Sequence, residues 1–227
     1  MMLMSGLSLL AATVPLPNAE ATPSPLPKAP PGGYLYVDEF DGPTGSAPNP
    51  ANWTVQNWQD DVWPPVAGQY RDDRQNVFLD GNSNLVIRAT QDNGDYFSGK
   101  VRGNWRVPMG HTWEARVKLD CLTSGAWPAY WAVNEDPLPD GEVDIMEFYG
   151  NLSWPPGTTV HAASNGKTWE SKSIAGLIDG AWHNWRMRWD EDGFKFWRDY
   201  VDGAAPYFKV PPKPIPVHGN PTDLRWP

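Results

Sequence analysis

The sequence predicts an all-β fold, an antiparallel β-sandwich or jelly roll, on the basis of two observations. From residue 34 onward, short strand-like runs follow one another, and none of them shows a sustained helical period. Turn residues stand between the runs, as in Asp80 to Ser83 and Asp190 to Gly193, and they suit hairpins because Asp, Asn and Gly tolerate left-handed backbone conformations. A chain of 227 residues is long enough for one sizeable core, so a single sandwich domain is expected.

The expected strands follow these runs in chain order. They cover residues 34–40, 53–58, 76–79, 84–90, 96–102, 112–119, 127–133, 142–149, 159–163, 182–189 and 194–200. The pattern changes near the end of the chain, where six prolines fall within residues 210–227 and no alternation is left. The folded domain is therefore expected over residues 34–209, followed by an irregular Pro-rich tail over residues 210–227.

The N-terminal segment is expected to lie outside the folded domain. The first dozen residues are apolar and small, and Ala19-Glu20-Ala21 matches a small-x-small cleavage site, so residues 1–21 are interpreted as an export signal although no basic residue precedes it. Five prolines and a Gly pair make residues 22–33 an extended linker. The apolar run is too short to span a bilayer, so we expect a secreted, extracellular protein with no membrane partner.

The composition indicates which partners are expected. A net charge of -9, a pI of about 4.8 and only 18 Lys and Arg residues disfavour a nucleic-acid groove and favour an uncharged polymer. The 14 Trp residues suit such a polymer, because indole rings stack on the apolar faces of sugars. We expect a polysaccharide substrate, no nucleic acid and a monomeric chain.

Motifs for metals, nucleotides and nucleophilic serines are missing from the sequence. Its four His residues have no zinc-site spacing, and there is no Gly-x-Ser-x-Gly elbow, phosphate-binding Gly-rich loop or dinucleotide fingerprint. The single cysteine, Cys121, cannot form an internal disulfide and is expected to be a buried small hydrophobic residue. No catalytic metal and no cofactor are therefore expected.

One segment carries a strong chemical signal, because residues 142–147 (Glu-Val-Asp-Ile-Met-Glu) place three carboxylates in an otherwise apolar strand. Side chains alternate along a strand, so Glu142 and Asp144 share one face whereas Glu147 has the wrong parity. A β-bulge at Ile145-Met146 would return Glu147 to the acidic face. The carboxyl groups of the two Glu residues would then lie about 5 to 6 Å apart, the separation found in retaining glycosidases.

Three neighbouring acids suit a retaining mechanism. One carboxylate attacks the anomeric carbon, and a second protonates the leaving oxygen before it activates water. Asp144, between the two Glu residues, would raise the pKa of a neighbour and hold a shared proton. Two other interpretations stay open, a calcium site and a solvated edge strand with alternate acids, although the uniformly apolar opposite face argues against the second.

Aromatic and amide side chains are the candidates for sugar contacts. Trp127 and Trp131 lie four residues apart on one strand face, a spacing equally compatible with a cleft floor and with the core. Six further residues would suit sugar hydroxyls or rings, namely Asn57, Trp58, Asn76, Arg102, Asn104 and Trp105. Each of these six, taken singly, is better explained by a structural role, and only Asn76 is kept as a predicted substrate contact.

Residues 142–147 resemble the active-site signature of glycoside hydrolase family 16, in its bulged form with two residues between the Asp and the second Glu. Gly125 to Trp131 is similar to that family's Gly-x-Trp-Pro-Ala-aromatic-Trp strand, and Val37 to Gly42 to its Asp-Glu-Phe-Asp-Gly opening. Trp182 to Gly203 is similar to its Trp-His strand and the hairpin that ends in Val-Asp-Gly. The resemblance runs from about residue 34 to residue 207.

The resemblance implies a concanavalin A-like jelly roll with a concave cleft and a retaining mechanism. It assigns the nucleophile to Glu142, the acid/base to Glu147 and an assisting role to Asp144. Three more positions match residues that line the cleft in the family: Trp127, Trp131 and His161.

The end of the chain departs from the family pattern. The family normally continues into a further strand on the cleft side and a final strand that pairs near the N-terminus, and residues 210–227 resemble neither. The jelly roll is therefore expected to lack its closing strands and to leave a sheet edge open. The family's structural calcium draws ligands from both chain ends, so Glu39 and its neighbours would supply half a site, which leaves a calcium ion doubtful.

Taken together, the residues and the resemblance predict a secreted, endo-acting, retaining hydrolase of a β-linked glucan or galactan, with β-1,3-glucan as the first candidate. A transglycosylase with the same acids is chemically adjacent, because water and a sugar hydroxyl compete for one glycosyl-enzyme. A catalytically impaired, lectin-like carbohydrate-binding sandwich is the alternative from another class. A chain that does not fold for want of its closing strands is the third.

Overall fold

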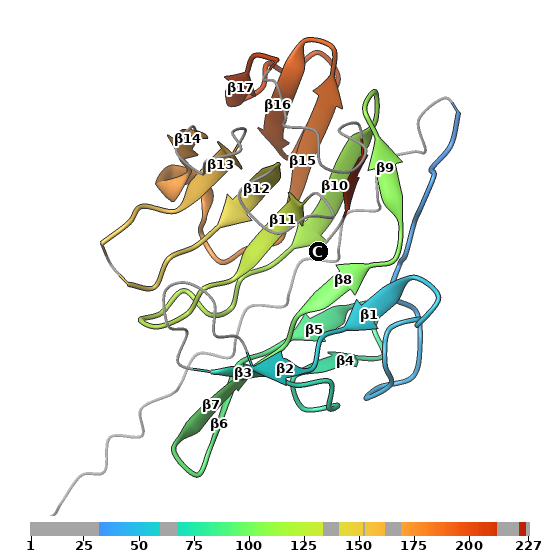
Figure 1. Cartoon of the computed structure of the whole chain (residues 1–227), viewed down its shortest axis with the longest axis vertical. Coiled ribbons are helices and arrows are strands. Elements are labelled where there is room, and N and C mark those ends of the chain that lie inside the picture. The colour runs from blue at the N-terminus through green and yellow to red at the C-terminus, as the bar shows by residue number, and fades with distance from the viewer. Residues whose placement is uncertain are drawn as a thin grey trace, which may run out of the picture. The chain divides into compact units, whose positions relative to one another are not determined.

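A computed structural model of the chain describes residues 32–59, 68–133, 141–151, 153–161, 169–212 and 223–225. The chain divides into two units after Gly33, and the unit that starts at Tyr34 contains all the strands of the described residues (Figure 1). The predicted export signal and all but the last two residues of the predicted linker lie outside the described residues. Within the described ranges, no helix is long and apolar enough to cross a membrane.

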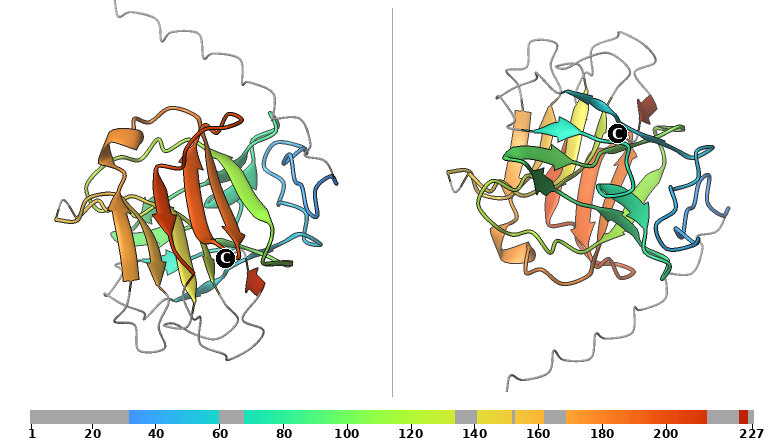
Figure 2. Two further views of the ribbon diagram at one scale, coloured as in Figure 1. Left: turned by 90° about the horizontal axis from the view of Figure 1, so that it is seen from above. Right: turned by 90° about the horizontal axis from the view of Figure 1, so that it is seen from below.

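Two larger antiparallel sheets hold most of the strands (Figures 1 and 2). The six-stranded sheet has the order β14 (Trp169–Ser173), β13 (Gly157–His161), β12 (Glu142–Glu147), β11 (Ala129–Val133), β18 (Asp223–Arg225) and β9 (Arg106–Pro108). The four-stranded sheet has the order β10 (Thr112–Val117), β15 (His183–Asp190), β16 (Gly193–Arg198) and β17 (Phe208–Val210). A 3-10 turn, η1 (Ala175–Leu177), stands between β14 and β15.

Three further sheets, one of them also four-stranded but with shorter strands, are formed by the first half of the described chain, in the lower part of Figure 1. One has the order β2 (Trp58–Gln59), β3 (Gln69–Tyr70), β7 (Asp95–Ser98) and β6 (Thr90–Asp92), and its β3 and β7 run parallel. Two antiparallel pairs complete the set: β1 (Trp53–Val55) with β8 (Val101–Gly103), and β4 (Val77–Leu79) with β5 (Leu85–Ile87).

The main core lies between the two larger sheets, because both turn a row of apolar side chains toward it. In β15, Trp185, Met187 and Trp189 alternate with less buried residues, as a half-buried strand requires. β12 contributes Val143 and Ile145 from the facing sheet, and all five side chains belong to one cluster. The apolar side of the acid-bearing strand is therefore anchored in the main hydrophobic core.

The predicted all-β sandwich is confirmed, and so are both hairpins. β4 and β5 are joined through Asp80, whose carboxylate accepts the backbone N–H groups of Asn82 and Asn84. β15 and β16 are joined by a two-residue turn, with Asp190 paired to Gly193.

The predicted strand over residues 34–40 is wrong. The Asp38 carboxylate accepts the Phe40 backbone N–H at 2.8 Å on one oxygen, and on the other it accepts Asn52 Nδ2 at 3.2 Å and Trp53 Nε1 at 2.9 Å. Phe40 also has a positive φ of 56°. A side chain that binds its own backbone holds this segment in an irregular conformation.

The tail and the cysteine also differ from expectation. β17 reaches Val210, and β18 lies between β11 and β9 although it falls within the Pro-rich residues 210–227. Three residues without proline are enough for a short ladder, but they are too few for an alternating pattern to be recognised. Cys121 is exposed rather than buried, because β10 ends at Val117 and the cysteine lies in the loop that follows.

Candidate active site

The three acids lie on β12, in the interior of the six-stranded sheet. On the β11 side, Tyr130 is opposite Met146 and Trp131 is opposite Asp144, so Ile145 has no partner. On the β13 side the register also shifts between Asp144 and Glu147. Two residues of β12 therefore face one residue of each neighbour, and the predicted bulge at Ile145-Met146 is confirmed.

The bulge sends two consecutive side chains into the core. Ile145 and Met146 are both fully buried, and the strand phase changes by one residue at this point. Glu147 is thereby returned to the side of Asp144, and its charge helps to raise the pKa of the Asp144 carboxyl group. The three carboxyl groups therefore form one contiguous cluster.

A buried hydroxyl pair supports the bulge. Thr158 Oγ1 donates to the carbonyl oxygen of Ile145 at 2.9 Å, and it lies 2.7 Å from the hydroxyl of Tyr207. Both hydroxyls are satisfied if Tyr207 donates to Thr158 and Thr158 donates to the carbonyl. A bulge leaves a backbone group without a partner in the strand ladder. Here that group is the Ile145 carbonyl, and the Thr158 side chain supplies its hydrogen bond. No pattern in the sequence indicates this contact.

Burial and mutual repulsion raise the pKa of two of the acids. Asp144 is almost inaccessible, and its burial, followed by the charge of Glu147, holds its pKa well above the usual range. Burial and the charges of Asp144 and Glu147 raise the pKa of Glu142 to about 8, with His161 opposing the shift. Asp144 is the most buried of the three, so we assign it the shared proton; once neutral, it no longer repels Glu142.

His161 joins the cluster from β13. Its Nε2 lies 3.0 Å from Asp144 Oδ2 and 3.8 Å from Glu142 Oε1. Within the described residues, these three side chains form the one group whose ligand atoms, all within 4.8 Å of one another, could hold a metal ion. Each of them is already paired with another member of the cluster.

The raised pKa values predict that stability falls with rising pH. Glu142 keeps a proton in the folded state up to about pH 8 but loses it near pH 4.5 when unfolded. The unfolded state thus binds fewer protons between these values, so the free energy of unfolding should fall by up to about 1.4 kcal/mol per pH unit per proton. Urea unfolding at pH 5, 6.5 and 8 measures this slope. Glu142→Gln should reduce it, exposed Glu191→Gln should not, and an equal slope in all three proteins would contradict the prediction.

Two side chains from outside the acid cluster donate hydrogen bonds to the two carboxylate oxygens of Glu147. Trp127 Nε1 donates to Oε1 at 3.0 Å, and the Tyr149 hydroxyl donates to Oε2. The Tyr149 ring lies between two indoles, with its centroid 5.8 Å from that of Trp127 and 5.4 Å from that of Trp154. Trp127 and Trp154 are 43% and 51% exposed, so they present large apolar surfaces beside Glu147.

Gly150 places Trp127 beside Glu147. The backbones of the two segments exchange hydrogen bonds, from Gly125 N–H to the Gly150 carbonyl at 3.0 Å and from Gly150 N–H to the Ala126 carbonyl at 2.8 Å. A Cβ atom at position 150 would lie 2.4 Å from the Thr123 carbonyl oxygen, so only glycine allows this approach.

The other predicted binding residues are placed differently. Trp131 is half-buried opposite Asp144, and the Lys100 ammonium lies 4.9 Å from the centre of its ring. Asn76 is fully buried and donates to the Arg88 carbonyl and the Thr90 hydroxyl, so its position does not support the expected sugar contact. The residue type alone does not distinguish an asparagine that makes structural hydrogen bonds in the interior from one that binds a sugar.

The weaker candidates for sugar binding fall into two groups: residues that make structural contacts and residues that are exposed. Trp105 stacks on Tyr36 and meets Trp53 edge to face, and Asn104 binds Thr54 and the Pro50 carbonyl. Asn57 and Arg102 are exposed, and the Trp58 side chain lies outside the described residues. Sequence reasoning missed Tyr149, although its position two residues after Glu147 predicts the same strand face.

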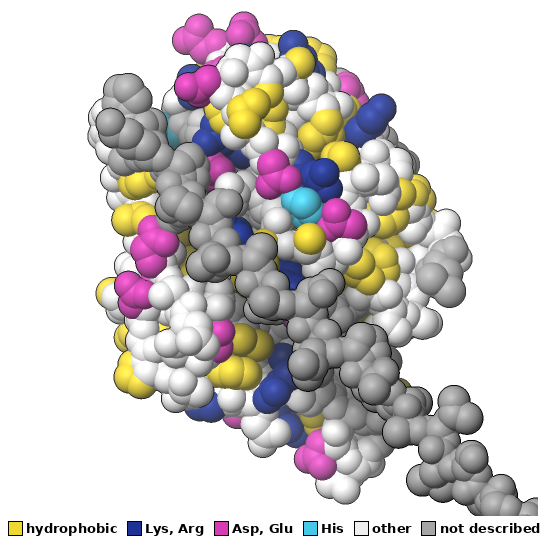
Figure 3. All heavy atoms as spheres, turned by 180° about the vertical axis from the view of Figure 1, so that it is seen from behind, with side chains coloured by type: hydrophobic (Ala, Val, Ile, Leu, Met, Phe, Trp, Pro, Cys, Tyr) yellow, Lys and Arg dark blue, Asp and Glu magenta, His cyan; other side chains and the backbone are white. Residues whose placement is uncertain are grey.

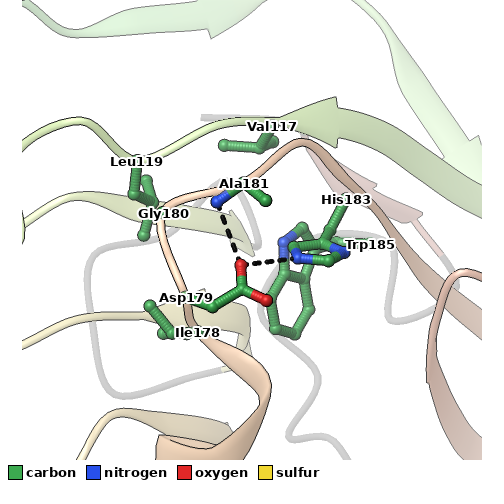
Figure 4. A pocket seen from close by; sticks show the side chains of 8 residues that line it. All are labelled: Val117, Leu119, Ile178, Asp179, Gly180, Ala181, His183 and Trp185. Atoms are coloured by element: carbon green, nitrogen blue, oxygen red, sulfur yellow. Dashed lines mark hydrogen bonds and ion pairs between the residues drawn. The ribbon is translucent and has the colours of Figure 1, made fainter. Parts of the chain in front are cut away.

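A small pocket also lies where β10 ends and β15 begins (Figure 4). Its wall is mostly apolar, and its polar groups are paired: Asp179 Oδ1 accepts the Ala181 backbone N–H at 2.9 Å and lies 2.8 Å from His183 Nε2. His183 Nδ1 lies 2.6 Å from Asp199 as well. None of the three acids of β12 lines this pocket. On the face shown in Figure 3, charged side chains of both signs are interspersed with hydrophobic ones.

The family model for glycosyl hydrolases family 16 matches residues 66–209, which is more than half of the chain. The chain belongs to this family. The resemblance predicted from residues 142–147 is thereby confirmed, and the all-β family 16 protein shares its jelly roll with solved structures.

Solved structures and a curated protein resemble this family 16 protein. It is 49% identical to a protein of Mycobacterium tuberculosis described as an immunostimulatory antigen and pseudo β-1,3-glucanase, with a TM-score of 0.77 and 84% of each chain covered. It is 51% identical to a β-1,3-glucanase from Mycobacterium marinum, with a TM-score of 0.78 and 86% of each chain covered. A glucan endo-1,3-β-glucosidase A1 of Niallia circulans is 25% identical over 213 residues, and the match spans 78% of this chain but only 29% of that protein.

Proposed function

We propose that the protein is a retaining endo-glycosidase that hydrolyses a β-linked glucan, with a β-1,3-glucan as its substrate. The observation that carries this proposal is the cluster on β12, where the bulge brings Glu147 back beside Asp144, and ligand atoms of Glu142, Asp144 and His161 lie within 4.8 Å of one another. Two carboxyl groups with distinct surroundings, joined through a third, suit a double displacement that needs no cofactor.

Each acid has a separate task in this proposal. Glu142 attacks the anomeric carbon and forms a glycosyl-enzyme, while Glu147 gives its proton to the departing oxygen. Glu147 then takes a proton from water, whose oxygen attacks the same carbon and releases Glu142. Glu142 loses its proton before it attacks, and a neutral Asp144 favours that loss because it removes the repulsion between the two carboxylates. Trp127 and Trp131 would provide ring faces for the sugars on either side of the bond.

The choice of β-1,3-glucan rests on relatives. The proteins from Mycobacterium marinum and Niallia circulans are described as acting on that linkage. A carbohydrate-binding protein without turnover is the second candidate function, and it is favoured by one relative, since the Mycobacterium tuberculosis protein is described as a pseudo β-1,3-glucanase. We further propose that the protein acts outside the cell, where such polymers occur.

The deciding experiment measures reducing-end release from laminarin, lichenan and agarose by the full chain, with binding to the same polymers followed by affinity electrophoresis. Release from laminarin alone is the expected result, and the exposed-site variant Glu191→Gln should behave like the wild type. Retardation by laminarin without any release would replace the hydrolase with the carbohydrate-binding alternative. Release from agarose only would change the substrate class to a galactan.

A further inference from the structure

The carboxylate of Glu147 is bound on both oxygens in the resting protein. Trp127 Nε1 donates to Oε1 and the Tyr149 hydroxyl donates to Oε2, and Glu147 itself is only 7% exposed. Hydrogen-bond donors on a carboxyl group favour its ionised form.

The two donors to Glu147 differ in whether they can also accept a hydrogen bond from it. An indole N–H is a donor only, so Trp127 cannot accept a proton placed on Oε1. A phenol hydroxyl donates or accepts, so when Oε2 is protonated the Tyr149 hydroxyl either turns round to accept that proton or goes on donating, more weakly, to a neutral oxygen. While it donates to Oε2, the Tyr149 hydroxyl therefore opposes protonation of Glu147, the step that a departing sugar oxygen needs.

Tyr149 is held in place for this contact. Its ring packs against Trp127 on one side and meets Trp154 edge to face on the other, and the next residue, Gly150, is fixed by two backbone hydrogen bonds to the segment that carries Trp127. Burial and the charge of Glu147 raise the pKa of Tyr149, so its hydroxyl stays a neutral donor at physiological pH.

We infer that Tyr149 is a positioning residue that holds Glu147 as a carboxylate and so restrains the leaving-group protonation step. This inference rests on the proposed function, because it assigns the acid step to Glu147. The proton balance is simple: Tyr149 keeps its own proton, and Glu147 takes one from the solvent or from Asp144 when the Tyr149 hydroxyl turns away. Protonation of the leaving oxygen, rather than attack by Glu142, then limits turnover of a natural polymer.

The variant Tyr149→Phe removes the hydroxyl and keeps the ring between its two indoles. Two substrates separate the steps: laminarin, whose leaving sugar needs a proton, and 2,4-dinitrophenyl β-laminaribioside, whose leaving phenolate does not. With laminarin at pH 7 we expect kcat to rise about tenfold, since a hydrogen bond to a charged group contributes that much to an equilibrium. The alkaline limb of the pH–rate profile should move to higher pH, and the rate of the first step with the aryl substrate, measured as the burst of dinitrophenolate, should not change. Tyr96→Phe, at an exposed tyrosine outside the site, should leave all three quantities unchanged.

A pH titration of the Glu147 carboxyl group does not depend on turnover, so it separates the role inferred for Tyr149 from the proposed hydrolase function. In protein carrying 13C-labelled Glu carboxyl groups, the signal lost in Glu147→Gln is that of Glu147, and in Tyr149→Phe its pH transition should move to higher pH. An unmoved transition, or a fall in laminarin turnover with the aryl rate unchanged, would overturn the inference. A moved transition with no product from either substrate would leave the hydrogen bond in place and overturn the proposed hydrolase instead.

Discussion

Replacing Glu142 with Gln should reduce the release of reducing ends from laminarin by at least about 10³-fold while binding is retained. The amide has nearly the shape of the carboxylate but cannot form the glycosyl-enzyme, so the loss falls on kcat rather than on affinity. Glu142 pairs with His161 on β13, and its side chain is mostly buried, so the isosteric change should preserve the sheet. Steady-state kinetics and affinity electrophoresis with laminarin measure the two effects separately.

Two further variants make this expectation specific. Glu191→Gln removes an exposed Glu carboxylate and should leave kcat unchanged. Glu142→Ala opens space beside the sugar, and azide should then restore part of the turnover of an aryl glycoside by replacing the lost nucleophile. Full turnover by Glu142→Gln would rule out this residue as nucleophile and would return the role to another carboxylate of the cluster.

Replacing Thr158 with Val should lower both the stability and the activity of the protein. Valine fills the space of threonine but leaves the Ile145 carbonyl, which accepts from Thr158 at 2.9 Å, without its buried partner. Such a group costs about 1 to 3 kcal/mol, and Tyr207 loses its acceptor in the same change. Because the bulge sets the position of Glu147, kcat with laminarin should fall together with the free energy of unfolding.

The control for this variant is Thr158→Ser, which keeps the hydroxyl and removes only a methyl group. It should retain most of the activity, with a smaller loss of stability from the vacated volume. Urea denaturation and laminarin turnover are measured on both proteins. If Val and Ser lower the stability equally, the hydroxyl is not what supports the bulge, and packing around residue 158 would be responsible.

The position of the acids could be predicted from the sequence because strand parity is a strong constraint. Three carboxylates over residues 142–147 share a face only if one residue is extra, and the apolar Ile145-Met146 pair is where the core can take it. The partners that complete the site could not be derived this way. Thr158 and Tyr207 come from strands or loops whose register the sequence does not state, and their hydroxyls have no local pattern.

Two expectations from the sequence, a strand around Asp38 and a sugar contact at Asn76, fail because of contacts made by the tertiary fold. A strand was expected around Asp38, but its carboxylate binds three donors, two of them from residues 52 and 53, a contact that local alternation does not record. Asn76 has the chemistry of a sugar ligand, but it is buried and donates instead to the Arg88 carbonyl and the Thr90 hydroxyl. The partners of Asp38 and Asn76 are set by the tertiary fold, which local sequence patterns do not record.

The place of β18 has a consequence for how the protein is made. This strand lies between β11 and β9, with Leu224 paired to Val107. The sheet that carries the acids therefore pairs strands that are far apart in the sequence. Contacts of such long range slow folding. On the ribosome, β9, β11 and β12 emerge well before β18, and the row of backbone groups between β9 and β11 stays open until then. During that interval the nascent chain exposes a sheet edge on which another strand could pair, so its yield should depend on chaperones that bind such edges.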